Sequence, residues 1–335
     1  MNQTSAYSHI ICYISWDCDD EIVFLFQFYF FSRCMSIKIR DAISHLIGHE
    51  IAVDIDDDLL QLIKTANTHG WKLDKLEKDF WLTICLQYLA TSCPELSFKW
   101  WTYLNKVYRP YFRLSEDLDF SQSIEAYPSD GARKQYARGM REKVKHIASV
   151  MWRDLNDDEE HHKKARGNPH IADMKYTYLK YILKYPSLLD GSEQEIKIEV
   201  TYTHKRHLPQ VQMPLQSLYR DLVYERPLFP EQRISCMHLD EMMAEKMRAS
   251  LTREYPAIRD FFDIWWMRRD GYDFELINDL VQAKVAESGN RITVTDAYDT
   301  LQEDIEQELW SVLLSLEDFA FDETFDFVNQ FVLQK

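Results

Sequence analysis

The chain has 335 residues, of which 46% are hydrophobic and 28% are charged, so it can bury a core and is neither disordered nor of low complexity. This length suggests about two domains. The 39 Lys and Arg residues against 55 Asp and Glu give a net charge of −16, which argues against a general polyanion binder; any contact with nucleic acid must come from a local basic patch. There are only eight glycines, and the Gly-rich loops of dinucleotide and Walker-type phosphate sites are absent.

The cysteines and the longest apolar run bear on location. The six cysteines contain no C-x-x-C pair, so neither a zinc ribbon nor a disulfide framework is indicated, and a reducing cytoplasm is the expected compartment. The longest apolar run, Ile22–Phe31, has about ten residues where a membrane helix needs about 20. We therefore predict no membrane partner.

The first 90 residues divide into two segments. Residues 1–34 show no helical periodicity and end at Cys34-Met35, so we interpret them as a doubtful N-terminal extension, with Met35 as an alternative start. Over residues 35–90 apolar side chains recur at helical spacing, which predicts a helical N-terminal region.

The middle of the chain mixes strands and helices over residues 91–205. From Leu239 onward the pattern is again helical, and we assign residues 206–335 to a helical C-terminal domain. The first expected elements of the middle region are a strand at Leu96–Lys99, a helix at Thr102–Tyr108 and an alternating segment around Leu114–Phe120. A helix at Asp130–Arg153 and a solvated charged loop at Asn156–Asn168 follow. The last two elements are strands at Lys175–Leu183 and Glu195–Thr203, which form a hairpin about the turn at Asp190-Gly191.

Two aspartates in the alternating segment indicate a metal site. Asp117 and Asp119 project from one face of a strand, because residues two apart share a face, while Leu118 and Phe120 point into the core. Such paired carboxylates suit divalent cations such as Mg²⁺, which clamp a triphosphate and activate an attacking hydroxyl. The alternative is the plain polar face of an edge strand.

A third carboxylate lies on the second strand of the hairpin. Between Ile196 and Val200 the aliphatic residues alternate with Lys197 and Glu199, which share the polar face. If this strand pairs with the first, three carboxylates converge, and Glu199 can act as a general base or a bridging metal ligand. An ordinary amphipathic strand is the alternative.

Charged residues on two later helices are further candidates. Lys246 borders the buried face of the helix that begins at Leu239, from where it can reach a phosphate or simply extend to solvent. Asp260 and Asp263 are predicted on the polar face of the next helix. Arg259 with Asp263 is alternatively an i,i+4 ion pair.

These blocks together resemble the AbiEii-type abortive-infection toxins, which are nucleotidyltransferases with a polymerase-β-like fold. The resemblance covers roughly residues 80–270 and keeps the order of the motifs. It implies an α+β protein, in which a nucleotidyltransferase core with a small mixed sheet is flanked by the two helical regions. The matching blocks are Phe98-Lys99, Thr102, Leu104–Lys106, Phe112–Phe120, Ile198-Glu199, Glu245–Ala249 and Arg259–Asp263.

The resemblance also implies roles. Asp117 and Asp119 would hold Mg²⁺, and Glu199 would complete the catalytic acidic triad. The protein would be an Mg²⁺-dependent toxin that transfers nucleotides from a nucleoside triphosphate to an acceptor, expected to be the 3′ end of tRNA, and a cognate antitoxin would neutralise it. The nucleotide contacts would come from Lys99, Thr102, Lys106, Ser115, Lys197, Lys246, Asp260 and Asp263.

The chain departs from the family at one motif, because Trp100-Trp101 stand where the family has two glycines. The glycines let backbone N–H groups approach the phosphates, whereas indoles add bulk. The indoles can obstruct the phosphates, fold into a core, or stack on a nucleobase. This departure keeps open a second hypothesis, a catalytically silent binding protein with the nucleotidyltransferase fold.

A basic stripe marks the helix over residues 130–153, which carries seven basic and two acidic residues. Lys134, Arg138, Arg141 and Lys145 recur at i, i+4, i+7 and i+11 and so share one face. We predict that they bind the phosphate backbone of an RNA acceptor; the alternative is a solvated helix face.

Overall fold

The computed structural model describes part of the chain, namely residues 39–108, 114, 116–151, 155–157, 176–203, 206–289, 294, 297–309 and 319–333. The chain falls into two units, Met1–Lys38 and Ile39–Lys335, and every described residue belongs to the second. The predicted extension 1–34, Ser115 and residues 158–168 of the predicted charged loop lie outside the described residues.

Within the described part of the chain, three helices precede the sheet, in the region where the periodicity predicts helix: α2 (Ile39–Ile47), α3 (Ile55–Ala66) and α4 (Leu73–Ser92). The 20-residue α4 is buried on nearly every side, including Asp79 and Thr83. A helix surrounded by protein needs no single apolar stripe, and its buried polar groups must find partners inside the core.

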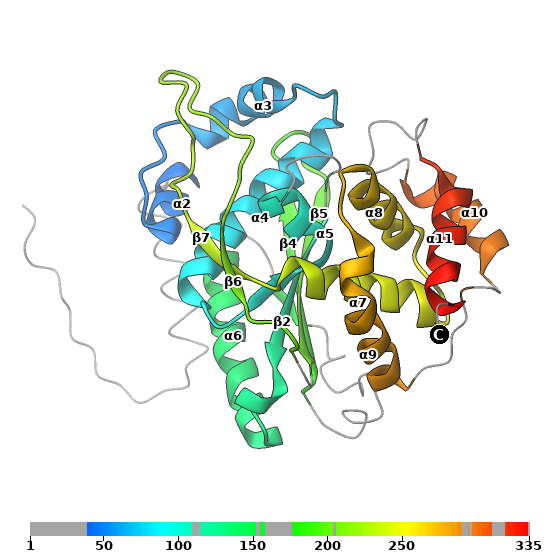
Figure 1. The fold of residues 1–335 in the computed structure, drawn as a ribbon. Coiled ribbons are helices and arrows are strands. Elements are labelled where there is room, and N and C mark those ends of the chain that lie inside the picture. Colours follow the sequence, from blue (N-terminus) through cyan, green and yellow to red (C-terminus); the bar gives the residue numbers. More distant parts are fainter. Residues whose placement is uncertain are drawn as a thin grey trace, which may run out of the picture. The chain divides into compact units, whose positions relative to one another are not determined.

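A mixed sheet forms the centre of the fold (Figure 1). In the described residues it has seven strands, in the order β3-β4-β5-β2-β1-β7-β6. β2 runs parallel to β5, and β1 runs parallel to β7; the other neighbours are antiparallel. The predicted hairpin is confirmed in β4–β5, where Gly191 takes the left-handed conformation at φ 74°. The strands are β1 (Ser97–Lys99), β2 (Asp117–Ser123), β3 (Leu155–Asp157), β4 (Tyr178–Pro186), β5 (Glu193–Thr203), β6 (Val211–Pro214) and β7 (Arg233–Cys236).

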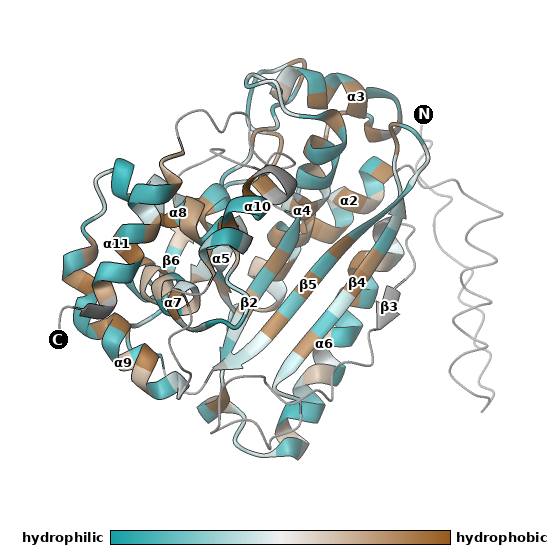
Figure 2. Cartoon of the chain, turned by 90° about the vertical axis from the view of Figure 1, so that its right-hand side faces the viewer, coloured by the Kyte–Doolittle hydropathy of each residue, from teal (hydrophilic) through white to brown (hydrophobic). Residues whose placement is uncertain are grey.

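The two faces of the sheet have different roles. Leu118, Ile198 and Tyr181 lie in register on β2, β5 and β4, and all are buried. Helix α6 (Asp130–Met151) covers this face, where the Tyr181 hydroxyl donates a hydrogen bond to the carbonyl of Ala137 at 3.0 Å. Figure 2 shows the alternation of hydrophobic and hydrophilic residues along these strands. The polar residues therefore face the side of the sheet away from α6.

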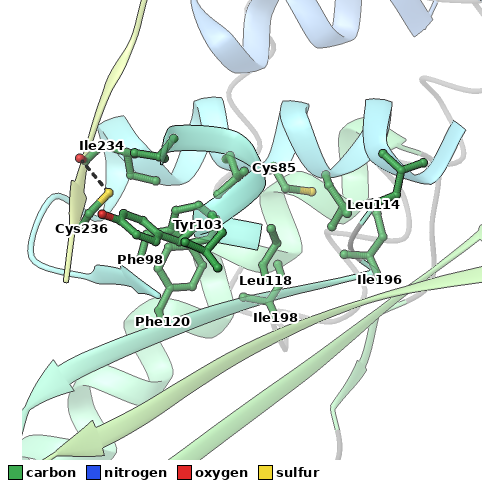
Figure 3. Close-up of a cluster of buried hydrophobic side chains, with 14 of the residues drawn as sticks. Cys85, Phe98, Tyr103, Leu114, Leu118, Phe120, Ile196, Ile198, Ile234 and Cys236 are labelled. Atoms are coloured by element: carbon green, nitrogen blue, oxygen red, sulfur yellow. Dashed lines mark hydrogen bonds between the residues drawn. The ribbon is translucent and has the colours of Figure 1, made fainter. Parts of the chain in front are cut away.

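The core beneath the strands is aromatic and aliphatic. The rings of Phe98 and Phe120, opposite each other on β1 and β2, have centroids 5.3 Å apart, and Tyr103 closes against Phe98 at 6.4 Å (Figure 3). Leu118 and Ile198 continue this cluster. Their burial anchors the strand residues between them, which project to the opposite face.

The chain after the hairpin both confirms and corrects the predicted elements. Helices α7 (Leu239–Thr252), α8 (Ile258–Arg269), α9 (Asn278–Ser288), α10 (Tyr298–Glu308) and α11 (Phe321–Leu333) confirm the helical C-terminal region. β6 and β7 extend the sheet beyond residue 205; each has only four residues, too few for periodicity to indicate a strand. None of the described helices is both long enough and apolar enough to cross a bilayer.

Two local predictions need correction. The predicted helix Thr102–Tyr108 is a four-residue α5 (Trp100–Tyr103) that continues as a π-helix over Leu104–Tyr108. The beginning of the predicted charged loop is the strand β3, which pairs with β4. In this case pairing with a long neighbouring strand outweighs the local preference of Asn and Asp for turns.

Candidate active site

The three predicted carboxylates lie on neighbouring strands. Because β2 and β5 pair in parallel, Asp119 lies opposite Glu199, and Asp117 lies opposite Lys197. Asp117, Asp119 and Glu199 are half-buried, and their strand neighbours Leu118 and Ile198 are fully buried. The structure thus brings the three acids together on the sheet face that α6 does not cover.

Burial, and to a smaller extent crowding, raises the pKa values of the two aspartates. Burial is the main cause that raises the pKa of Asp119 to about 7; Glu199 and Asp117 raise it further, against the ammonium of Lys99. Burial and Glu199 also raise the pKa of Asp117, against the lowering effect of Lys197. Buried carboxylates that repel one another favour a cation among them.

Lys99 supplies a positive charge next to the acids. It ends β1 opposite Asp119, and its ammonium lies 3.4 Å from the hydroxyl of Thr201. Burial lowers its pKa, whereas the neighbouring Asp119 and Glu245 raise it. Thr102 has a different position: it is fully buried, and its hydroxyl donates to the backbone carbonyl of Asp117, so it fixes the start of β2.

A cavity of about 440 Å³ opens over these residues. This volume is within the usual range of small-molecule sites, about 300–1,000 Å³. Both acidic and basic side chains line its wall, a combination that suits metal-bound phosphates. The lining residues are Lys99, Trp100, Asp117, Asp119, Glu199, Thr201, Met237, Glu245, Arg248, Arg253, Ala257 and Arg259.

Lys246, Asp260 and Asp263 form a buried ion cluster behind this wall. The ammonium of Lys246 lies 2.8 Å from a carboxylate oxygen of Asp263 and 3.3 Å from one of Asp260, and all three side chains are fully buried. Arg253 pairs with Asp260 at 2.8 Å. The two aspartates share one helix face as predicted, but that face is buried, because pairing with a buried lysine lets them enter the core.

Lys106 and Lys197, both predicted to contact the triphosphate, do not line the cavity. The ammonium of Lys106 lies 2.8 Å from Asp79 and 2.8 Å from Thr83, both on α4, and is buried there. Lys197 lies opposite Asp117 and pairs with Glu195 at 3.4 Å. Lys197 nevertheless lies close enough to Asp117 for its charge to lower the pKa of that carboxyl.

The basic stripe of α6 is exposed as predicted. Lys134, Arg138, Arg141 and Lys145 all reach solvent, and Val144 on the other side of the helix is buried. Since α6 covers the opposite face of the sheet from Asp119, the stripe and the carboxylates lie on opposite sides of the sheet. An acceptor that touches both must reach around the sheet.

Several lining residues were missed from the sequence. Thr201 follows Glu199 by two on the same strand face, so the alternation of β5 could have indicated it. Arg248, Arg253 and Arg259 lie near the junction of α7 and α8 and come together only in the folded chain. Glu245 joins them; burial raises its pKa, but Arg248 at 2.8 Å and Lys284 at 2.9 Å lower it more.

The acids fit a metal that arrives with its substrate. Within the described ranges, no three His, Cys, Asp or Glu side chains cluster closely enough to cage a metal ion. Mg²⁺ usually takes one or two carboxylates and completes its octahedron with water and substrate phosphates. Asp117 and Asp119, with pKa values raised by burial and mutual repulsion, are suitable as that pair.

Comparisons with known proteins bear on the family and the fold of the chain. Residues 94–328 match the family model of the nucleotidyl transferase AbiEii toxin of type IV toxin–antitoxin systems. The fold is similar to MenT4, a nucleotidyltransferase toxin from Mycobacterium tuberculosis, at 16% identity and TM-score 0.53, covering 82% of this chain and 89% of that one. JHP933 from Helicobacter pylori matches at 16% identity and TM-score 0.41, covering 79% and 92%. No curated protein matches the sequence significantly.

Proposed function

Since the chain belongs to the AbiEii family of nucleotidyltransferase toxins in type IV toxin–antitoxin systems, we propose that it transfers nucleotides from a nucleoside triphosphate to an RNA acceptor at the site of Asp117, Asp119 and Glu199. The observation that carries this proposal is the parallel register that sets Asp119 beside Glu199 on the wall of a cavity. The family membership favours an enzyme over a silent binding protein.

Asp117 and Asp119 are the proposed ligands of Mg²⁺. When bound, the metal neutralises charge on the phosphates and aligns them for displacement. The two aspartates orient the triphosphate by fixing the metal, and Leu118 and Phe120 hold the strand beneath them by packing in the core. The site is thereby placed on a rigid element of the sheet.

Glu199 is the proposed general base. Its carboxylate accepts the proton of the acceptor hydroxyl as that oxygen forms a bond to the α-phosphorus, and pyrophosphate leaves. Lys99, next to Asp119 on the neighbouring strand, and Arg248 on the cavity wall are the proposed partners of the phosphate oxygens.

The acceptor and the partners follow from the family and the charge distribution. We propose tRNA as the acceptor, with its 3′ end at the cavity and its helical body reaching the basic stripe of α6. A cognate antitoxin is the expected partner of a toxin of this family. A reducing cytoplasm suits Cys85, Cys93 and Cys236, which are buried thiols.

The test is a labelling assay. The purified protein is incubated with Mg²⁺, total RNA and each of the four α-labelled nucleoside triphosphates in turn. We expect label in an RNA band of tRNA size with at least one triphosphate, and none with an Asp117→Asn, Asp119→Asn double variant. The absence of label with all four triphosphates, or equal label in the double variant, contradicts the proposal.

A further inference from the structure

Trp100 has a backbone conformation that its side chain does not favour. Its φ is 62°, in the left-handed region, which is a clear outlier for a bulky residue other than glycine. Among the described residues only Tyr176 and Glu225 share this feature. The conformation directs a half-buried indole onto the cavity wall between β1 and the junction of α7 and α8.

The indole lies among three cations from separate parts of the chain. Its ring centroid is 5.0 Å from the ammonium of Lys246, 5.3 Å from that of Lys99 and 5.5 Å from the guanidinium carbon of Arg253. All three distances are inside the limit of about 6 Å for attraction between a cation and a ring. The negative face of the ring thus lies where these cations would otherwise hold an anion.

The three cations differ in whether they can bind an anion that enters the cavity. Lys246 is buried and paired with Asp260 and Asp263, so it stays in place. Lys99 and Arg253 line the cavity, and the side chain of Arg253 is 40% exposed. Phosphate oxygens are stronger partners for an ammonium or guanidinium group than a ring is, since both members of the pair are then charged.

We infer that the Trp100 indole is a built-in occupant of the polyphosphate subsite, held between Lys99 and Arg253, and that it must swing out before a polyphosphate binds. This inference rests on the proposed function, because it takes the cavity to be the triphosphate site. The ring covers these two cations in the unliganded protein, and the free energy needed to displace it lowers the affinity for every nucleoside triphosphate alike.

The experiment measures the affinity for tripolyphosphate by calorimetry with Mg²⁺ present, which needs neither a base, an acceptor nor chemistry. Four proteins are compared: wild type, Trp100→Gly, Trp100→Ala and Glu225→Gly. Trp100→Ala removes the ring but keeps a Cβ at the left-handed position, whereas Trp100→Gly also relieves the backbone. Glu225→Gly is the matched control, because it relieves a φ of 53° in the loop between β6 and β7.

We expect both Trp100 variants to bind tripolyphosphate at least tenfold more tightly than wild type, and Glu225→Gly to bind as wild type does. A melting curve for each protein verifies folding. If wild type binds tripolyphosphate as tightly as Trp100→Ala does, the inference is wrong. It is also wrong if only Trp100→Gly binds more tightly, because the effect then comes from the backbone. If no variant binds tripolyphosphate, the proposed triphosphate site itself fails.

Discussion

Asp119 on β2 lies opposite Glu199 on β5 and, on its other side, opposite Lys99 on β1. The hydrogen-bonding register of three strands therefore sets two carboxylates and one ammonium side by side. Burial raises the pKa of Asp119 to about 7, and Glu199 contributes to this rise, although the ammonium of Lys99 opposes it. The fold keeps this arrangement because the opposite sides of the same strands are anchored in the core.

The first prediction concerns catalysis. Asp117→Asn or Asp119→Asn should lower nucleotide transfer by more than about a hundredfold, because a neutral amide of nearly equal volume cannot replace a charged metal ligand. The rate of label incorporation into RNA measures this loss. Glu193→Gln, an exposed carboxylate at the start of β5 paired with Lys184, is the matched control and should retain activity. Full activity in either aspartate variant contradicts the two-carboxylate assignment.

The second prediction concerns metal binding without nucleotide. Since Asp119 must lose its proton to bind a cation, and its pKa is raised to about 7, Mn²⁺ affinity should rise about tenfold per pH unit below pH 7 and level off above it. Calorimetric titrations with Mn²⁺ over about three pH units, from roughly pH 5.5 to 8.5, measure how the affinity changes with pH. Asp119→Asn should bind weakly with no such step, and a step that persists in this variant assigns the proton to another group.

The third prediction concerns stability. Between the unfolded pKa of 3.8 and the folded value of about 7, the unfolded chain releases the proton of Asp119 while the folded protein keeps it. The contribution of Asp119 to stability is therefore fully present below pH 3.8 and is lost as the pH rises through 7. Asp119→Asn should raise the free energy of unfolding at pH 8 by of order 2–4 kcal/mol. Urea denaturation of wild type and Asp119→Asn in EDTA at pH 5 and pH 8 tests this. A larger increase in the free energy of unfolding at pH 5 than at pH 8 contradicts the prediction.

The sequence predicted the parts of this site that depend on local periodicity. Alternation along β2 and β5 placed Asp117, Asp119 and Glu199 on polar faces, and the structure agrees. The alternation does not reveal that the two strands pair in parallel. This pairing joins segments about 80 residues apart and depends on how the chain between them folds.

Two other features could not be read from the sequence for different physical reasons. The helical pattern of α8 predicts Asp260 and Asp263 on a polar face, because a periodicity argument assigns charged residues to the side away from the core. Their burial is favourable only because Lys246 on α7 pairs with both. The left-handed backbone of Trp100 has no local signal, because tryptophan does not favour that conformation.

The fourth prediction concerns the ion cluster. Lys246→Met should lower the free energy of unfolding by about 3–5 kcal/mol, because it leaves Asp260 and Asp263 buried without their ammonium. Adding Asp263→Asn should recover part of this loss, since one uncompensated charge is then removed. Lys64→Met, at an exposed position on α3, is the control and should change stability little. Urea denaturation measures all four proteins, and an unchanged midpoint in Lys246→Met contradicts a structural role for this lysine.

The last prediction concerns the basic stripe of α6. Because Lys134, Arg138, Arg141 and Lys145 lie on the opposite side of the sheet from the carboxylates, only a large acceptor can reach both. Reversing these charges should raise the KM for full-length tRNA and leave the KM for a short oligonucleotide with the same 3′ end unchanged. Each lost phosphate contact should also make the salt dependence of tRNA affinity shallower by about 0.7–0.9 in the log–log slope. Reversing Glu142, which pairs with Lys145 at 3.1 Å, should act in the opposite direction. Equal salt slopes in wild type and the reversed variant would show that the stripe is a solvated helix face.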